Sequence, residues 1–239
     1  MALRTGLFRL AFDDGALTLL AAAPFDPARF RFNEGACDGK GRFWLGTMYD
    51  PKASGDASSR PLKGQWHSYS EHEGLRAHRH FAVVPNGLAW SADDRVLFTS
   101  HTRNRIIWVF DYELAAGRLG RRRVFARIPK EHGAPDGCAI DAEGCYWSAL
   151  NGGSRLRRFR PDGSIDRDVM LPVSRPTMCA FGGAQLDTLY VTTQSDQLSE
   201  QERQAQPLAG KLLCVQPGVR GRRPGLFGTD PRRMAQVVR

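Results

Sequence analysis

Two copies of one pattern decide the fold: Asn86-Gly87-Leu88-Ala89-Trp90-Ser91 before Val96-Leu97-Phe98-Thr99, and Asp136-Gly137-Cys138-Ala139-Ile140-Asp141 before Cys145-Tyr146-Trp147-Ser148-Ala149. In each copy a polar residue precedes glycine, and a short apolar run follows. A turn rich in Asp, Glu or Gly comes next, and a second β-prone run ends the pattern. We therefore expect two copies of one structural unit, with Asn86 and Asp136 at the same position in each.

The same frame recurs before and after this stretch. Aligned on the polar position, the repeats start at Glu34, Asn86, Asp136 and Thr177, with spacings of 52, 50 and 41 residues. Periods of about 40 to 50 residues that hold several short strands are typical of β-propellers. Residues 5–20 predict a further β-hairpin. The sequence thus predicts an all-β propeller with four to five blades.

Length and composition restrict the number of domains and the kinds of partner. Its 239 residues, of which 41% are hydrophobic, fit one all-β domain, which we place at residues 1–220. Residues 221–239 form an Arg, Pro and Gly-rich tail that we expect to be loosely held. The net charge of +9 is spread along the chain with no nucleic-acid-binding motif, which argues against nucleic acid as a partner. No stretch is long and apolar enough for a membrane span, so we expect no membrane partner and a cytoplasmic location.

Other side chains have simpler explanations. The five cysteines show no metal or disulfide spacing, and Cys138 and Cys179 are expected to pack in the core. The recurring tryptophans, Trp44, Trp90, Trp108 and Trp147, are also expected in the core. His78 and His80 alternate along an Arg-rich segment, so we expect solvated side chains in preference to a metal pair.

The polar residues before the inner strands are the candidate site. In a propeller the first strand of each blade starts near one mouth of the central channel, so Glu34, Asn86 and Asp136 are expected to converge there. Asn and Asp oxygens suit a hard divalent cation such as Ca²⁺, Mg²⁺ or Mn²⁺. The alternative is that Asn-Gly and Asp-Gly are only turn dipeptides.

Several motifs in combination resemble the gluconolactonase, regucalcin and senescence-marker protein-30 family. They are Arg31-Phe32-Asn33-Glu34-Gly35, Gly41-Arg42-Phe43-Trp44-Leu45-Gly46-Thr47-Met48, Asn86-Gly87-Leu88-Ala89-Trp90-Ser91, Pro135-Asp136-Gly137 and Arg175-Pro176-Thr177-Met178-Cys179. The resemblance covers residues 3–220 and implies a six-bladed propeller that hydrolyses sugar lactones with a divalent cation, which can be Ca²⁺, Zn²⁺, Mn²⁺ or Mg²⁺.

The resemblance also implies roles for individual residues. Asn86 and Asp136 match metal ligands, and Asp136 also matches the general base. Arg31 and Asn33 match residues that bind the lactone, and Asn86 and His101 are further candidates on the substrate side. The sequence leaves the particular lactone and the oligomeric state open.

Three departures from the family pattern qualify this expectation. The family's remaining metal ligand, a Glu in the first blade, has no counterpart, so we expect an incomplete propeller that lacks most of that blade and part of the second. We accordingly expect weak metal affinity and low or absent activity. His101 stands where many relatives carry Asp, and Tyr49-Asp50-Pro51 replaces a substrate-side Glu. The alternative function is therefore a non-catalytic propeller that binds a cation or a protein.

Overall fold

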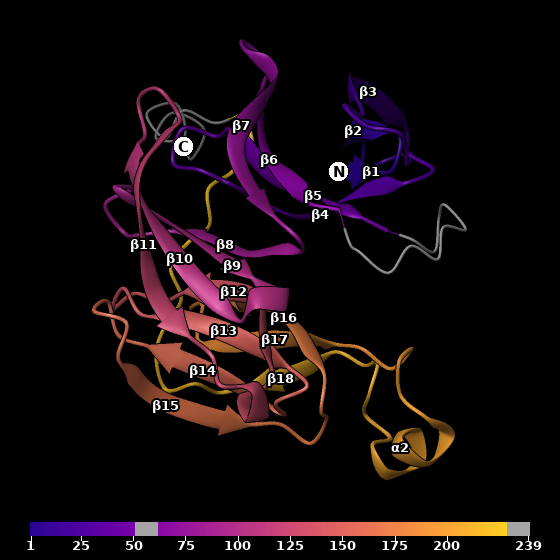
Figure 1. The fold of residues 1–239 in the computed structure, drawn as a ribbon, viewed down its shortest axis with the longest axis vertical. Helices are drawn as coiled ribbons and strands as arrows, with labels where there is room; N and C mark the ends of the chain where they lie inside the picture. Colours follow the sequence, from indigo (N-terminus) through magenta and orange to yellow (C-terminus); the bar gives the residue numbers. More distant parts are fainter. Residues whose placement is uncertain (51–61, 229–239) are drawn as a thin grey trace. The chain divides into compact units, whose positions relative to one another are not determined.

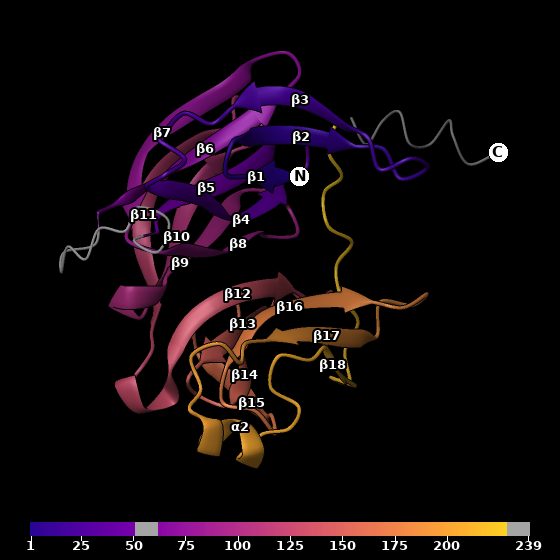
Figure 2. The ribbon, with the colours of Figure 1, turned by 90° about the vertical axis from the view of Figure 1, so that its right-hand side faces the viewer.

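The computed structural model describes residues 1–50 and 62–228, and most of its regular structure is antiparallel β-sheet (Figures 1 and 2). The contacts between residues divide the chain into two units. Unit 1 comprises Met1–Pro85 and Gly225–Arg239, and unit 2 comprises Asn86–Pro224. Within the described residues no helix is long and apolar enough to cross a membrane.

Unit 1 contains two antiparallel sheets, each with its strands in sequence order. The first sheet consists of β1 (Ala2–Leu3), β2 (Gly6–Leu10) and β3 (Leu17–Ala22). The second consists of β4 (Phe30–Cys37), β5 (Phe43–Tyr49), β6 (Gly64–Ser70) and β7 (Gly74–Ala82). The hairpin predicted for residues 5–20 is confirmed as β2 and β3, and the structure adds the short β1.

Unit 2 contains three sheets, again with consecutive strands as neighbours. The first consists of β8 (Pro85–Trp90), β9 (Val96–His101), β10 (Ile106–Glu113) and β11 (Arg118–Arg127). The second consists of β12 (Ala134–Ile140), β13 (Tyr146–Asn151), β14 (Arg155–Phe159) and β15 (Ile165–Met170). The third consists of β16 (Pro176–Gly182), β17 (Thr188–Thr193) and β18 (Leu213–Val215). Short helices η1 (Thr102–Asn104), η2 (Lys130–His132) and α2 (Glu200–Ala205) lie between strands.

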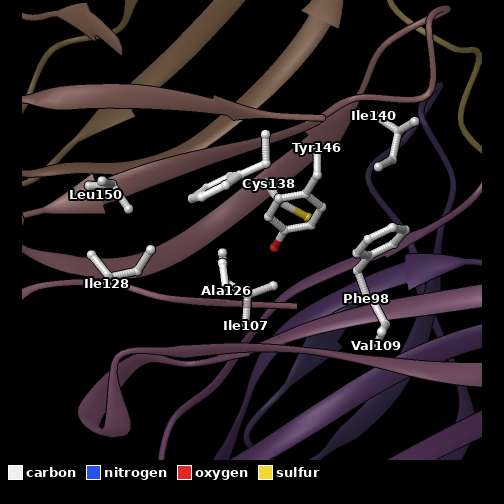
Figure 3. Packing of buried hydrophobic residues seen from close by; sticks show 10 residues of the cluster. Phe98, Ile107, Val109, Ala126, Ile128, Cys138, Ile140, Tyr146 and Leu150 are labelled. Atoms are coloured by element: carbon white, nitrogen blue, oxygen red, sulfur yellow. The ribbon is translucent and has the colours of Figure 1, made fainter. Parts of the chain in front are cut away.

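The described residues therefore form five antiparallel sheets of three or four strands, which are the blades of an all-β propeller fold. This number confirms the prediction of four to five blades from the repeat spacing. The core between the sheets β8 to β11 and β12 to β15 is built from aromatic and aliphatic side chains of both (Figure 3). Phe98 stacks on Tyr146 with ring centroids 5.1 Å apart.

The small and aromatic residues of the repeat are mostly buried, as expected. Trp44, Trp90 and Trp147 are no more than 4% exposed, and Cys138 and Cys179 are also buried. Trp108 is only half-buried, with the Arg122 guanidinium 4.3 Å from its ring centroid. All five cysteines are free thiols.

A buried aspartate anchors the turn after the first strand in two of the sheets. Asp38 Oδ1 accepts hydrogen bonds from the backbone of Lys40 and Arg42, and its Oδ2 accepts from Trp44 Nε1 at 3.3 Å. Asp141 repeats this arrangement, and Trp147 Nε1 donates to its Oδ2 at 2.8 Å. Ser91 takes the place of the aspartate in a third sheet, where its Oγ accepts from Val96 N.

These anchors correct the alignment of the repeats. Asp136 lies five residues before Asp141 and Asn86 five before Ser91, whereas Glu34 lies only four before Asp38. The strand register agrees, because the bulge between Phe32 and Gly35 matches the bulge between Pro135 and Cys138. The residue equivalent to Asp136 is thus Asn33, and the expectation that Glu34 occupies this position was wrong.

The described part of the predicted tail makes specific contacts. Arg222 donates to the carbonyl oxygens of Trp90 and Ser91 within unit 2. In unit 1, Gly228 N donates to Gly41 O at 3.0 Å, and Phe227 stacks on Tyr69 with centroids 6.0 Å apart. Residues 221–224 thus contact unit 2 and residues 225–228 contact unit 1. Residues 229–239 lie outside the described part, so the expectation of a loosely held tail stays a prediction.

Candidate functional site

Asn86 and Asp136 lie inside β8 and β12, so the alternative that their dipeptides only form hairpin turns is wrong. The following glycines are needed for close packing. A Cβ at Gly87 would lie 2.3 Å from Tyr146 Oη, and one at Gly137 would lie 2.1 Å from Met178 Sδ. The small residue at Gly137 lets the first strands β12 and β16 approach, which agrees with the position of β12 beside β16 in Figures 1 and 2. At Gly87 the missing side chain leaves room for Tyr146 of β13.

The Asn86 side chain is 5% exposed and held by its own sheet. Its Nδ2 donates a hydrogen bond to Thr102 Oγ1 at 2.8 Å. Thr102 begins η1, directly after β9, which runs beside β8. Because this bond uses the amide nitrogen, Oδ1 is the atom that Asn86 offers to a cation.

Asp136 is held through both its backbone and its carboxylate. Ser100 Oγ donates to Asp136 O at 3.0 Å, which ties β12 to β9 of the preceding sheet. Asn151 Nδ2 lies 3.4 Å from Asp136 Oδ2 and 3.2 Å from Gln194 Oε1. The carboxylate thus faces an amide donor at the end of β13. The bulge in β12 at this point changes the direction of the side chain.

His101 ends β9 and contacts a different part of its sheet. Its ring centroid lies 6.1 Å from that of Trp108. Burial, and secondarily the positive charge of Arg122, lower the pKa of His101 to about 4, so the imidazole is neutral at pH 7. The contribution of this neutral ring to substrate binding stays a prediction.

Arg31 and Asn33 are brought together in β4 of unit 1. Arg31 Nη1 donates to Asn33 Oδ1 at 2.8 Å, and Arg31 Nε lies 3.4 Å from Asp50 Oδ2. Asn33 Nδ2 donates to Pro85 O at 3.0 Å. The half-buried guanidinium is therefore fixed in direction by a carboxylate and an amide. Their role in binding a lactone stays a prediction from the resemblance.

The sequence analysis did not identify Thr102, Asn151 and Gln194. A signal was present, because each residue is polar and lies at or just after the end of the second strand of its repeat. Their sequence neighbours carry no motif, so only the contacts distinguish them from ordinary loop residues.

As candidate donors for a cation, Asn86 offers an amide oxygen and Asp136 offers a carboxylate. Among the residues that the structure describes, no group of three or more His, Cys, Asp or Glu side chains is placed to hold a metal ion. Two oxygen donors fit a hard cation that keeps several water ligands, as Mg²⁺ and Ca²⁺ do. Soft, sulfur-preferring metals fit less well, because both candidate donors are oxygen atoms.

An all-β chain of consecutive antiparallel blades, with oxygen donors at matching positions on its first strands, defines a β-propeller with a candidate cation site. The chain matches the family model described as SMP-30/Gluconolactonase/LRE-like region over residues 1–195. It belongs to this family, as the sequence resemblance predicted.

Known proteins agree with this assignment. The chain is 34% identical over 228 residues to a 6-deoxy-6-sulfogluconolactonase of Pseudomonas putida, covering 95% of this chain and 76% of that protein. It is 32% identical to the regucalcin of Gallus gallus, with the same shares covered. A solved structure of a calcium-binding regucalcin from Agrobacterium tumefaciens superimposes with a TM-score of 0.86 at 25% identity, covering 95% of this chain and 75% of that one.

Proposed function

We propose that this protein hydrolyses sugar lactones, with a divalent cation held by Asn86 and Asp136. The observation that carries the proposal is the matching placement of these two oxygen donors on β8 and β12, each held by a residue at the end of the next strand. Membership of a family that includes a 6-deoxy-6-sulfogluconolactonase supports the substrate class.

A cation bound there would supply a Lewis acid that polarises the lactone carbonyl and stabilises the oxyanion. Asp136 then has the second role of a general base, with its carboxylate accepting a proton from the attacking water. The water oxygen bonds to the carbonyl carbon, the ring C–O bond breaks, and the ring oxygen takes up a proton. The product is the open sugar acid.

Acid release from a panel of aldonolactones tests this proposal. The reaction is followed in weak buffer with added Ca²⁺, Mn²⁺, Mg²⁺ or Zn²⁺, and with a chelator. Turnover should need a cation and should fall at least about 100-fold in Asp136→Asn, because that change removes both the base and an anionic ligand.

A matched control is Asp162→Asn, which changes an exposed turn carboxylate. It should leave turnover unchanged. Cation binding by folded protein without any lactone turnover would contradict the proposal and favour the alternative of a non-catalytic binding propeller.

A further inference from the structure

One position in unit 2 recurs at the end of the second strand of each sheet. Thr102 follows β9, Asn151 ends β13 and Gln194 follows β17. The strand register shows that Thr102 and Asn151 are equivalent. The residues just before them, His101 and Leu150, pair with the first residues of the next strands, Ile106 and Arg155. Residues three positions later support it, since Arg105 and Ser154 share a left-handed backbone, with φ of 52° and 51°.

Residues at this position contact the proposed ligands of their own sheets. Thr102 Oγ1 accepts from Asn86 Nδ2 at 2.8 Å. Asn151 Nδ2 donates toward Asp136 Oδ2 over 3.4 Å, which is long for such a bond. Polar contacts in catalytic sites without substrate are often long and tighten when the site is filled.

Gln194 links the second contact to the third sheet. Its Oε1 lies 3.2 Å from Asn151 Nδ2, so the two hydrogens of that amide have an acceptor each. The opposite amide orientation would place Asn151 Oδ1 against two oxygens and is excluded by repulsion. The Gln194 backbone is in turn fixed, because its N–H donates to Arg175 O at 2.9 Å.

We propose that Thr102 and Asn151 are positioning residues for the cation site, and that Gln194 sets the orientation of Asn151. Thr102 holds the amide nitrogen of Asn86 so that Oδ1 is presented to the cation. Asn151 directs and partly neutralises the Asp136 carboxylate. The inference rests on the proposed function, since it concerns the same two ligands. Residues that orient metal ligands typically change affinity or activity 10- to 100-fold when they are replaced.

Substitutions of matched shape test the role of Thr102. Thr102→Val keeps the volume and removes the hydroxyl, and it should weaken the affinity for Mn²⁺, measured by electron paramagnetic resonance, about 10-fold or more. Thr102→Ser keeps the hydroxyl and should restore the affinity. The control is Thr99→Val in β9, the strand that precedes Thr102, because the buried Thr99 Oγ1 has no hydrogen-bond partner in the described structure. It should bind Mn²⁺ as the unaltered protein does.

Asn151→Leu and Gln194→Leu test the other contact, with Gln216→Leu as the control. Gln216 directly follows β18, which pairs with β17, and it bonds Thr188 at the end of β17 opposite to Gln194. Asn151→Leu should lower Mn²⁺ affinity about 10-fold or more and lower kcat more than it changes KM, with a smaller effect for Gln194→Leu. Gln216→Leu should change neither.

Side-chain amide NMR of the metal-free protein separates the two proposals. The Asn86 amide signals should move in Thr102→Val and stay in Thr99→Val, and the Asn151 signals should move in Gln194→Leu. If they do not move, the positioning role is overturned, whatever the lactone assay shows.

If lactone turnover and Mn²⁺ binding are normal in Thr102→Val and Asn151→Leu, the positioning role is also overturned while the proposed function stands. If the signals move but the unaltered protein neither binds a cation nor hydrolyses lactones, the proposed function fails and the contacts are structural.

Discussion

At the residue scale, Asp141 carries the largest predicted effect on stability. Its carboxylate is fully buried and bonds Trp147 Nε1 and Arg158 Nε, each at 2.8 Å, while Arg158 itself is 5% exposed. Removing Asp141 takes one carboxylate away from the buried Arg158 and leaves the buried Trp147 Nε1 without its acceptor. Asp141→Ala should therefore lower the free energy of unfolding by about 3 kcal/mol, measured by urea denaturation.

The control for this prediction is an exposed ion pair. Glu113 and Arg118 have side chains that are 49% and 67% exposed, so Glu113→Ala should cost less than about 1 kcal/mol. Equal losses in the two variants would show that Asp141 is not the anchor of its turn. Glu143 and Asp166 also bond Arg158. Because they still pair with Arg158 in Asp141→Ala, they limit the loss of stability in that variant.

Single residues also show what the sequence can and cannot predict. Asn86 and Asp136 were identified because each precedes glycine in a repeated frame, and the structure places them at equivalent points. Glu34 was misplaced because it also precedes glycine, although its distance to Asp38 was one residue too short. The anchoring aspartate was the better reference, since its hydrogen bonds to the turn fix the register.

At the element scale, the packing of β7 against β5 and β6 depends on a buried histidine. His78 is 7% exposed, its Nε2 lies 2.8 Å from Ser68 Oγ, and its ring stacks on Trp44 with centroids 4.1 Å apart. The prediction of solvated side chains was therefore wrong for His78. Alternation along β7 points this side chain inward, and its Arg neighbours concealed that in the sequence.

This burial makes unit 1 sensitive to acid. Loss of solvation, with smaller contributions from Arg76, His67, His80 and Arg42, lowers the pKa of His78 to about 4 from 6.5. Since the folded state resists protonation, the unfolded chain binds more protons between pH 6.5 and 4, and stability falls as the pH falls through this range. The loss from pH 7 to pH 5 should be about 1 to 2 kcal/mol in urea unfolding.

His78→Leu is the variant that tests this dependence. It should be less stable than the unaltered protein at pH 7, because Ser68 loses its partner, but its stability should fall less between pH 7 and pH 5. The control is the same exchange at the exposed His72, which should keep the full dependence. An identical pH dependence in His78→Leu and His72→Leu would disprove the assignment to His78.

At the scale of the whole molecule, the two chain ends contribute to the same unit. In the described part of the chain, unit 1 includes residues 225–228 in addition to its N-terminal residues, whereas Asn86–Pro224 forms unit 2. The sequence predicted the blades well, because hydrophobic alternation and turn residues are local signals. It could not predict the attachment of residues 225–228, because an Arg, Gly and Pro-rich composition is typical of loose tails and the partners lie far away in the sequence.

Phe227 is the residue that should reveal this attachment. It is half-buried, packs in the cluster formed by Leu7, Phe32, Leu45 and Tyr69, and follows Gly225, where a Cβ would lie 2.5 Å from Cys37 O. Phe227→Ala should lower the stability of unit 1 by about 1 to 2 kcal/mol, less than the cost for a fully buried ring. Hydrogen exchange should accordingly speed up in β4 to β6 and stay unchanged in β12 to β14.

Leu226→Ala, which changes an exposed neighbour of Phe227, should alter hydrogen exchange in neither region. Faster exchange confined to the last residues in Phe227→Ala would mean that the C-terminal segment rests on unit 1 without stabilising it.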